Sequence, residues 1–183
     1  MTEELLEGAA RVLARDGAAA FTTNRVAEAA GVSIGSLYQY YPNKVSLLLA
    51  LHERDAEQVW GKLAGVLDDE TLPPRARLDA AIQGFFDAEI AGDELHAALA
   101  EAQALISATP AFQEFESQVI EKLRAFLEKS LPHRRDEHEY LARVCFAVVT
   151  ATGERAAVRR LDSAQTRELG AATARMMCDF LGV

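Results

Sequence analysis

The stretch from Thr22 to Leu51 constrains the fold most strongly, because it predicts two short helices joined by a tight turn and followed by a third. Thr22 and Thr23 are candidates to cap the first helix, since a hydroxyl can accept a hydrogen bond from its free amides. Gly31 follows that helix, where a residue without a Cβ bends the chain at the lowest cost. Ser33 can cap the second helix in the same way. The order of these signals predicts a helix-turn-helix.

The residues of this segment separate into an inner and an outer set. Ala27 is a small residue where the two helices cross, and Leu37 is the apolar anchor of the second helix. Pro42 should end that helix at Tyr41, because proline disfavours helical geometry in the residue before it. The polar and aromatic residues around Leu37, among them Gln39, are left facing out. A helix that enters the major groove of DNA needs such an exposed face, so the segment predicts DNA binding.

The string from Gly31 to Lys44, G-V-S-I-G-S-L-Y-Q-Y-Y-P-N-K, resembles the signature of the TetR family of bacterial transcriptional regulators. The close match covers roughly the first third of the chain, and the rest matches only in the number and length of its helices. The resemblance implies an all-α fold with an N-terminal three-helix helix-turn-helix DNA-binding domain, residues 1–50. It also implies a C-terminal helical ligand-binding and dimerisation domain, residues 51–183.

The residues of the helix-turn-helix can be assigned expected roles on double-stranded operator DNA. Gln39 is the expected base reader, with adenine as its usual partner. Tyr38 and Tyr40 can give hydroxyls to phosphate and apolar contact to thymine methyl groups. Flanking polar side chains should hold the DNA backbone, and small residues should permit close approach. The expected DNA-binding residues are Thr22, Thr23, Arg25, Ser33, Ile34, Gly35, Ser36, Tyr38, Gln39, Tyr40 and Lys44.

Apolar residues at helical spacing predict helices along the rest of the chain. A first helix should run from about Thr2 to Arg15, with Gly17 as its stop signal. From Lys44 a single apolar stripe predicts one long connecting helix, which ends before the break at Asp68–Pro74. Further helices are expected over residues 78–90, ending near Gly92, then over 95–106, 112–127, 136–160 and from a cap at Ser163 to the end. We find no pattern typical of β-strands.

The charge of the chain leaves a second function open. The net charge is −9, and through Leu51 four basic residues stand against five acidic ones. Such a balance is unusual for a nucleic-acid binder, although a local basic patch suffices. The alternative is a protein–protein adaptor that has the same fold but has lost DNA binding. The segment keeps the exposed polar and small residues that a helix-turn-helix uses on DNA, which favours a DNA-binding repressor. Few basic residues are needed, because backbone amides and hydroxyls also contact phosphate.

The last two predicted helices carry small residues that permit close approach of another helix. In the TetR family these two helices pair with their symmetry mates in a four-helix bundle. A two-fold homodimer is also what a palindromic operator requires. The expected dimer-interface residues are Val148, Ala151, Thr152, Ala156, Ala172, Met176 and Phe180.

Aromatic residues of the second domain predict a cavity for a small-molecule effector of unknown identity. Glu89 lies on the stripe of two phenylalanines, and a carboxylate among rings would favour a cationic ligand. Alternatively, Glu89 reaches water at the edge of the stripe and the rings are ordinary core. The expected ligand-binding residues are Trp60, Phe85, Phe86, Glu89, Gln103, Phe112, Phe115 and Phe146.

No catalytic or cofactor motif is present in the sequence, so we expect neither an enzyme nor a cofactor. His133 and His138 flank a polar loop that we interpret as solvated and not as a metal site. Cys145 and Cys178 lie in apolar helical runs and are interpreted as buried, reduced thiols, with a redox pair as the alternative. Neither a signal peptide nor a membrane-spanning run is apparent, so we expect a cytoplasmic protein.

Overall fold

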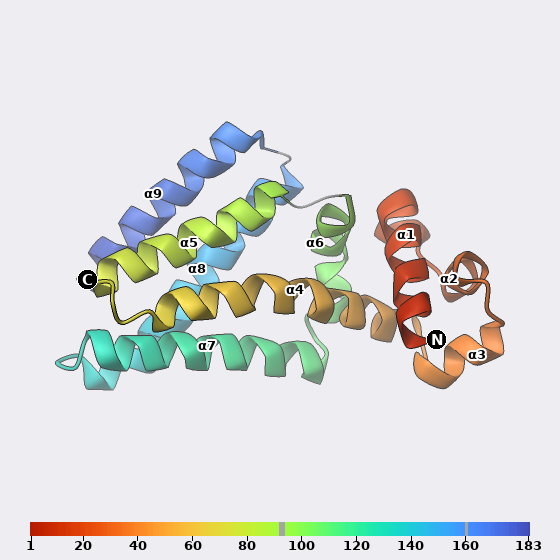
Figure 1. Cartoon of the computed structure of the whole chain (residues 1–183), viewed down its shortest axis with the longest axis horizontal. Helices are drawn as coiled ribbons and strands as arrows, with labels where there is room; N and C mark the ends of the chain where they lie inside the picture. The colour runs from red at the N-terminus through yellow and green to blue at the C-terminus, as the bar shows by residue number, and fades with distance from the viewer. Residues whose placement is uncertain (92–93, 160) are drawn as a thin grey trace. The chain divides into compact units, whose positions relative to one another are not determined.

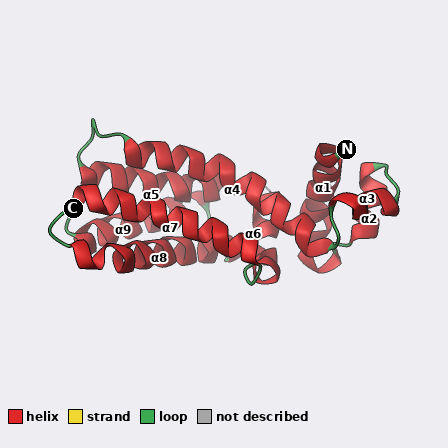
Figure 2. Ribbon diagram, turned by 90° about the horizontal axis from the view of Figure 1, so that it is seen from below, coloured by secondary structure: helices red, strands yellow, loops and turns green. Residues whose placement is uncertain are grey.

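The computed structural model of the chain describes residues 1–91, 94–159 and 161–183 (Figure 1). Every regular element within these residues is a helix (Figure 2), which confirms the predicted all-α fold. The predicted helix ends near Gly92 and at Arg160 lie outside the described residues. In chain order the elements are α1 (Thr2–Ala20), α2 (Thr23–Ala30), α3 (Ile34–Tyr40), α4 (Lys44–Asp68), α5 (Pro74–Ala91), α6 (Glu94–Ile106), α7 (Pro110–Ser130), the 3₁₀ turn η1 (Arg135–Glu137), α8 (His138–Val158) and α9 (Ser163–Leu181).

The turn between α2 and α3 has the predicted geometry. Thr22 caps α2, and its hydroxyl accepts a hydrogen bond from the amide of Arg25. Gly31 has φ 69° and ψ 27°, a left-handed conformation that a residue without a Cβ adopts without strain. Ser33 caps α3 by accepting from the amide of Ser36. These contacts are local, so the sequence alone dictates the shape of the motif.

Helix α1 is interrupted where the sequence predicted its end. Gly17 has φ 73° and ψ 170°, which is outside the helical region, and the helical segment then resumes as far as Ala20. The buried face of α1 precedes this kink and includes Leu5, Val12 and Leu13. Gly17 therefore ends the core-forming part of α1, although the helical turns extend further than predicted.

The helices pack into two compact units. The first consists of Met1–Glu57 and Gly92–Gln113, and the second of Gln58–Ala91 and Glu114–Val183. Helix α4 thus contributes its first part to one unit and its last part to the other. The domain boundary between residues 50 and 51 stays a prediction, but the packing also assigns α6 to the first unit.

The core of the first unit is built from distant parts of the chain. Helix α6 packs against α1, so residues after position 90 complete a core that begins at Leu5. Gly8 of α1 lies against α2, where a Cβ at Gly8 would come within 2.8 Å of the Ala30 Cβ. The buried residues are Leu5, Leu6, Ala9, Ala10, Val12, Leu13, Phe21, Val26, Ala27, Leu37, Tyr41, Leu47, Leu48, Leu51, Ala98, Leu99, Ala102, Ile106 and Phe112.

The second unit has its own core between the last part of α4 and helices α5, α7, α8 and α9. Helices α5 and α9 lie side by side over much of their length (Figure 1). Their close approach depends on Gly170, because a Cβ there would lie 2.8 Å from the Cβ of Phe86. Phe86 and Leu141 are among the largest fully buried side chains of this unit.

The cap of α9 differs by one residue from the prediction of Ser163. Asp162 is the N-cap, and its Oδ1 accepts hydrogen bonds of 2.9 Å from the amides of Ala164 and Gln165. The Gln165 side chain accepts in return from the Asp162 amide at 3.1 Å. This reciprocal arrangement satisfies more of the free amides than a serine hydroxyl can, which explains why the helix begins there.

Candidate functional site

Helix α3 presents an exposed outer face above a single buried anchor. Leu37 is 0 % exposed, whereas Tyr38 and Tyr40 are 49 % and 46 % exposed. Ile34 and Gln39 are exposed as well. Because only Leu37 fixes this short helix in the core, exposed side chains occupy most of its circumference and form a rigid surface that suits contact with another molecule.

Four of the predicted hydroxyls are hydrogen-bonded to one another. The Thr23 Oγ1 of α2 lies 3.2 Å from the Tyr38 hydroxyl of α3. The Ser33 Oγ accepts from the Ser36 amide at 3.0 Å and lies 2.9 Å from the Ser36 Oγ. These contacts orient the hydroxyls before any ligand arrives. Each hydroxyl has one hydrogen, so one hydroxyl of each pair donates to the other and the second can still donate to a phosphate.

Lys44 is the first residue of α4 and follows a capped turn. The Asn43 Oδ1 accepts a hydrogen bond of 2.9 Å from the Ser46 amide and so caps α4. The Ser46 hydroxyl donates in turn to the Asn43 carbonyl at 2.7 Å. Lys44 therefore has a fixed backbone position beyond the end of α3.

Arg25 lies at the start of α2 within a cluster of three charged residues. Its Nη1 donates to the Asp16 Oδ2 and to the Ala20 carbonyl, both at 3.2 Å. Arg15 donates to both oxygens of Asp16, at 2.7 and 2.9 Å. The hydrogen bonds from Arg15, with a smaller contribution from the charge of Arg25, lower the pKa of Asp16. Sequence reasoning assigned Arg25 to DNA but did not identify its acidic partner.

Two histidines, His52 and His96, have defined contacts in the first unit. The His96 Nδ1 of α6 lies 2.9 Å from the Asp55 Oδ2 of α4. The His52 ring lies 4.9 Å from the ring of Phe112, centroid to centroid. Burial lowers the pKa of His52. Both contacts join α4 to the segment that contains α6 and the start of α7.

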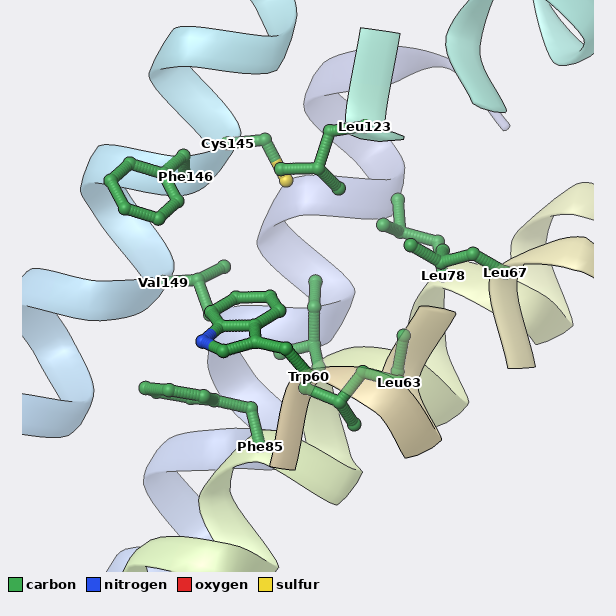
Figure 3. A pocket seen from close by; sticks show the side chains of 11 residues that line it. Trp60, Leu63, Leu67, Leu78, Phe85, Leu123, Cys145, Phe146 and Val149 are labelled. Carbon is green, nitrogen blue, oxygen red and sulfur yellow. The ribbon is translucent and has the colours of Figure 1, made fainter. Parts of the chain in front are cut away.

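The second unit contains a small apolar cavity beside Trp60 (Figure 3). The Trp60 ring centroid lies 5.9 Å from that of Phe85 and 6.3 Å from that of Phe146. The space available to the centre of a water-sized sphere is about 30 Å³. The lining residues are Trp60, Leu63, Leu67, Leu78, Ala81, Ile82, Phe85, Leu123, Cys145, Phe146 and Val149, and the surface that they expose to the cavity is apolar.

The predicted ligand-binding residues are distributed over both units. Trp60, Phe85 and Phe146 line the cavity, and Phe86 packs edge-on against Phe85 with ring centroids 5.7 Å apart. Phe115 packs against the core of the second unit. Three further predicted residues lie elsewhere: Glu89 is half-buried on α5 outside the cavity lining, and Gln103 and Phe112 belong to the first unit.

The aliphatic residues that line the cavity were not among the predicted ligand-binding residues, because neither an aromatic ring nor a polar group distinguishes them from ordinary core residues. Leu63 and Leu67 follow Trp60 at helical spacing on α4, so they share its stripe. Cys145 is the neighbour of Phe146 in the lining, and burial raises the pKa of its thiol to about 12. The spacing relative to Trp60 is the signal that would have identified the leucines.

Helices α8 and α9 expose apolar side chains on their outer surface. Among the predicted interface residues, Met176 and Phe180 are 52 % and 47 % exposed, and Ala151 and Ala172 are also exposed. Val148 and Thr152 are half-buried, whereas Ala156 is buried in the core of its own protomer. Tyr140, Val158 and Leu161 add further exposed apolar surface that sequence reasoning did not include.

The predicted polar loop before α8 is more structured than expected. His138 is the first residue of α8 and is buried, with its Nε2 lying 2.8 Å from the Leu131 carbonyl. Throughout residues 1–91, 94–159 and 161–183, His, Cys, Asp and Glu side chains form no group of three suited to a metal ion. In the same part of the chain, no helix has both the length and the apolar character needed to cross a membrane.

An exposed helix-turn-helix joined in one chain to a helical unit with an apolar cavity defines a class of protein, the DNA-binding transcriptional regulators. The family described as "Bacterial regulatory proteins, tetR family" matches residues 5–51. The family described as "Tetracyclin repressor-like, C-terminal domain" matches residues 73–181. The chain belongs to the TetR family of transcriptional regulators.

Individual relatives are similar over different lengths. The nucleoid occlusion factor SlmA of Aliivibrio fischeri (strain MJ11) is 33% identical over 69 residues, which cover 37% of this chain and 35% of that protein. The chain thus aligns with about a third of the length of this curated relative. The fatty acid degradation regulator FadR from Bacillus halodurans is 17% identical, with a TM-score of 0.74 over 100% of this chain and 98% of that one. FadR from Bacillus subtilis in complex with stearoyl-CoA is 17% identical, with a TM-score of 0.71 over 97% of both chains. At these identities the two FadR structures show the fold alone.

Proposed function

We propose that this TetR-family regulator is a ligand-responsive repressor that binds a palindromic operator as a homodimer and is released by a small molecule. The observation that carries the proposal is the outer face of α3, where exposed Tyr38, Gln39 and Tyr40 surround the fully buried Leu37. A recognition helix needs this combination, because a fixed backbone must present side chains to base edges.

The homodimer is supported by the outer surface of α8 and α9. Exposed Met176 and Phe180 lie one helical turn apart on α9, and α8 contributes exposed Ala151. Exposed apolar side chains favour association with a matching apolar surface. In a two-fold dimer the same residues of both protomers would meet, which would present two recognition helices to two half-sites.

The cavity beside Trp60 supports an apolar effector. Its lining contributes rings and aliphatic side chains and no charged residue. The similar fold of Bacillus subtilis FadR is in complex with stearoyl-CoA, so a long-chain acyl group is the first ligand to test. Binding of such a chain requires the cavity to widen beyond its volume of about 30 Å³. The hypothesis of a cationic ligand relied on Glu89, which lies outside the lining, so flat cationic compounds are the second class to test.

The test of DNA binding is selection of bound sequences from random double-stranded DNA. We expect enrichment of a palindrome whose half-sites lie about one helical turn apart or slightly more. The selected DNA then serves in a release assay with stearoyl-CoA and with a flat aromatic cation. Trp60, the sole tryptophan of the sequence, reports occupancy of the cavity through its fluorescence.

The possible outcomes separate the functions. Enrichment of a palindrome and its release by one ligand class support the repressor. Failure to enrich any palindrome contradicts the repressor and favours the adaptor, which the excess of acidic residues through Leu51 allows. Operator binding that neither ligand class reverses contradicts the proposed effector site while leaving the DNA-binding role intact.

A further inference from the structure

The carboxylate of Asp16 contacts Arg25, a residue of the candidate DNA-binding surface, and its sequence neighbour Arg15. Asp16 is near the end of α1, and its side chain is 16 % exposed. Arg15 contacts it through two nitrogens and Arg25 through one, so a single carboxylate holds two guanidinium groups. Through Leu51 the chain has four basic residues in all, and Asp16 engages half of them.

Arg25 is held at the edge of this cluster with much of its side chain still open. The guanidinium is fixed by Asp16 and by the Ala20 carbonyl, while the side chain is 51 % exposed. Arg25 belongs to the first turn of α2, whose Thr23 contacts Tyr38 of the recognition helix. The cluster therefore adjoins the surface that we assign to operator DNA.

A carboxylate and a DNA phosphate use the same guanidinium donors. Both are anions that accept charge-assisted hydrogen bonds, often two at a time. A phosphate that approached Arg25 would have to displace the Asp16 oxygen or accept the repulsion of its charge. The hydrogen bonds from Arg15 lower the pKa of Asp16, so this charge persists at neutral pH.

We propose that Asp16 is an internal competitor of the DNA phosphates for Arg25 and thereby weakens the binding of all DNA sequences. The inference rests on the proposed DNA-binding function and adds a means of regulating its strength. A repressor with moderate affinity for DNA needs only an effector that binds the DNA-free conformation somewhat more tightly than the DNA-bound one. This follows because the affinity for DNA and the affinity for the effector are thermodynamically linked.

The expected size of the effect follows from counterion release. Each phosphate that a cation neutralises steepens the dependence of log affinity on log salt by about 0.9, which corresponds to about three- to four-fold in affinity between about 50 and about 200 mM salt. The Asp16→Asn variant keeps a side chain of the same shape and an oxygen that accepts from Arg25, but removes the competing charge. In a dimer each protomer can gain one phosphate contact, so the slope of log affinity against log salt should steepen by about one to two.

The experiment compares the wild type with Asp16→Asn on the selected operator and on unrelated DNA of the same length, between about 50 and about 200 mM salt. We expect at least about three-fold tighter binding of both DNAs at the lower salt. Glu101→Gln is the matched control, because it removes the same charge from an exposed position on α6. In an Arg25→Gln background, Asp16→Asn should lose most of its effect.

Unchanged or weaker DNA binding by Asp16→Asn, with thermal unfolding unaltered, overturns the inference while the repressor function stands. An equal gain from Glu101→Gln also overturns it, because the effect would then be one of net charge. A gain that persists in the Arg25→Gln background does the same. A wild type that binds neither DNA overturns the proposed function itself, and the inference with it.

Discussion

Replacing Gly153 of α8 with alanine tests whether the space beside Trp60 binds the effector. A Cβ at Gly153 would lie 2.9 Å from the Cζ of Phe85 and closer still to its Cε1. Ordinary contact begins at 3.4 Å, so this edge of the ring has to recede by at least 0.5 Å. Because Phe85 lines the cavity, the displaced ring takes up space that a ligand would use.

Gly153→Ala should change the free energy of unfolding only a little but should lower the affinity for the ligand strongly. Overpacking a core lowers the free energy of unfolding by about 1–3 kcal/mol, whereas alanine in place of glycine within a helix raises it by about 1 kcal/mol. The net loss of unfolding free energy should therefore be about 0–2 kcal/mol. The cavity has a volume of only about 30 Å³, so even a small displacement of the Phe85 ring takes up a large share of it.

The assay follows the emission of Trp60 during titration with stearoyl-CoA, together with urea unfolding and operator binding without ligand. Ligand affinity should fall by at least about ten-fold, which corresponds to about 1.4 kcal/mol. Operator affinity should be unchanged. Gly65→Ala on α4 is the control, because a Cβ there meets no atom within 4 Å.

Adding Phe85→Leu to the Gly153→Ala variant should restore ligand binding, since the smaller side chain no longer meets the new methyl group. If Gly153→Ala binds the ligand as the wild type does, the cavity is not the effector site. If the double variant binds no better than Gly153→Ala, the loss does not act through the Phe85 ring. Either result refutes the reasoning from the geometry of Gly153.

The remaining predictions concern DNA, assembly and pH. Gln39→Ala should lose about 1–3 kcal/mol of discrimination at one base position, measured on point variants of the operator. Lys44→Ala should instead weaken all sequences alike and flatten the salt dependence by about 0.9 for each lost phosphate contact. Ala151→Glu, at an exposed position on α8, should convert the dimer to a monomer in sedimentation, and a wild type that is monomeric at micromolar concentration would contradict the dimer. Burial raises the pKa of Cys145 from 9.0 to about 12, so the stability that its thiol contributes is fully present below pH 9.0 and is lost as the pH rises toward 12. Unfolding curves across that range check this, and rapid alkylation of native Cys145 at neutral pH would argue against a buried thiol.

The helix-turn-helix could be predicted from the sequence because its determinants are local. Thr22, Ser33 and Asn43 each cap a helix with a hydrogen bond to an amide three residues away, and Gly31 adopts the left-handed turn. The cap of α9 was misplaced by one residue because Asp162 and Ser163 are both good caps. Only the reciprocal bond from Gln165 decides between them.

The packing of α6 could not be predicted, because an apolar stripe shows that a helix face is buried but not which helix it packs against. Ala98 and Ile106 have the same spacing and character as residues of the second unit, yet they join the core of α1. The same limit applies to the cavity, where an aromatic residue on a stripe can line a space, as Phe85 does, or fill the core of the first unit, as Phe112 does. Which of these occurs depends on contacts between helices far apart in the sequence.

The first unit is completed by Gly92–Gln113, a segment that is synthesised well after Met1–Glu57, and this order has a consequence during translation. Translation adds about 5–20 residues per second, so the stretch from Gln58 to Gln113 takes about 3 to 11 s to make. Until it is complete, Ala98 and Ile106 cannot cover the core that α1 has begun, and apolar surface stays open on the nascent chain. For that interval the DNA-binding half of the protein should be a client of chaperones that bind exposed apolar segments at the ribosome.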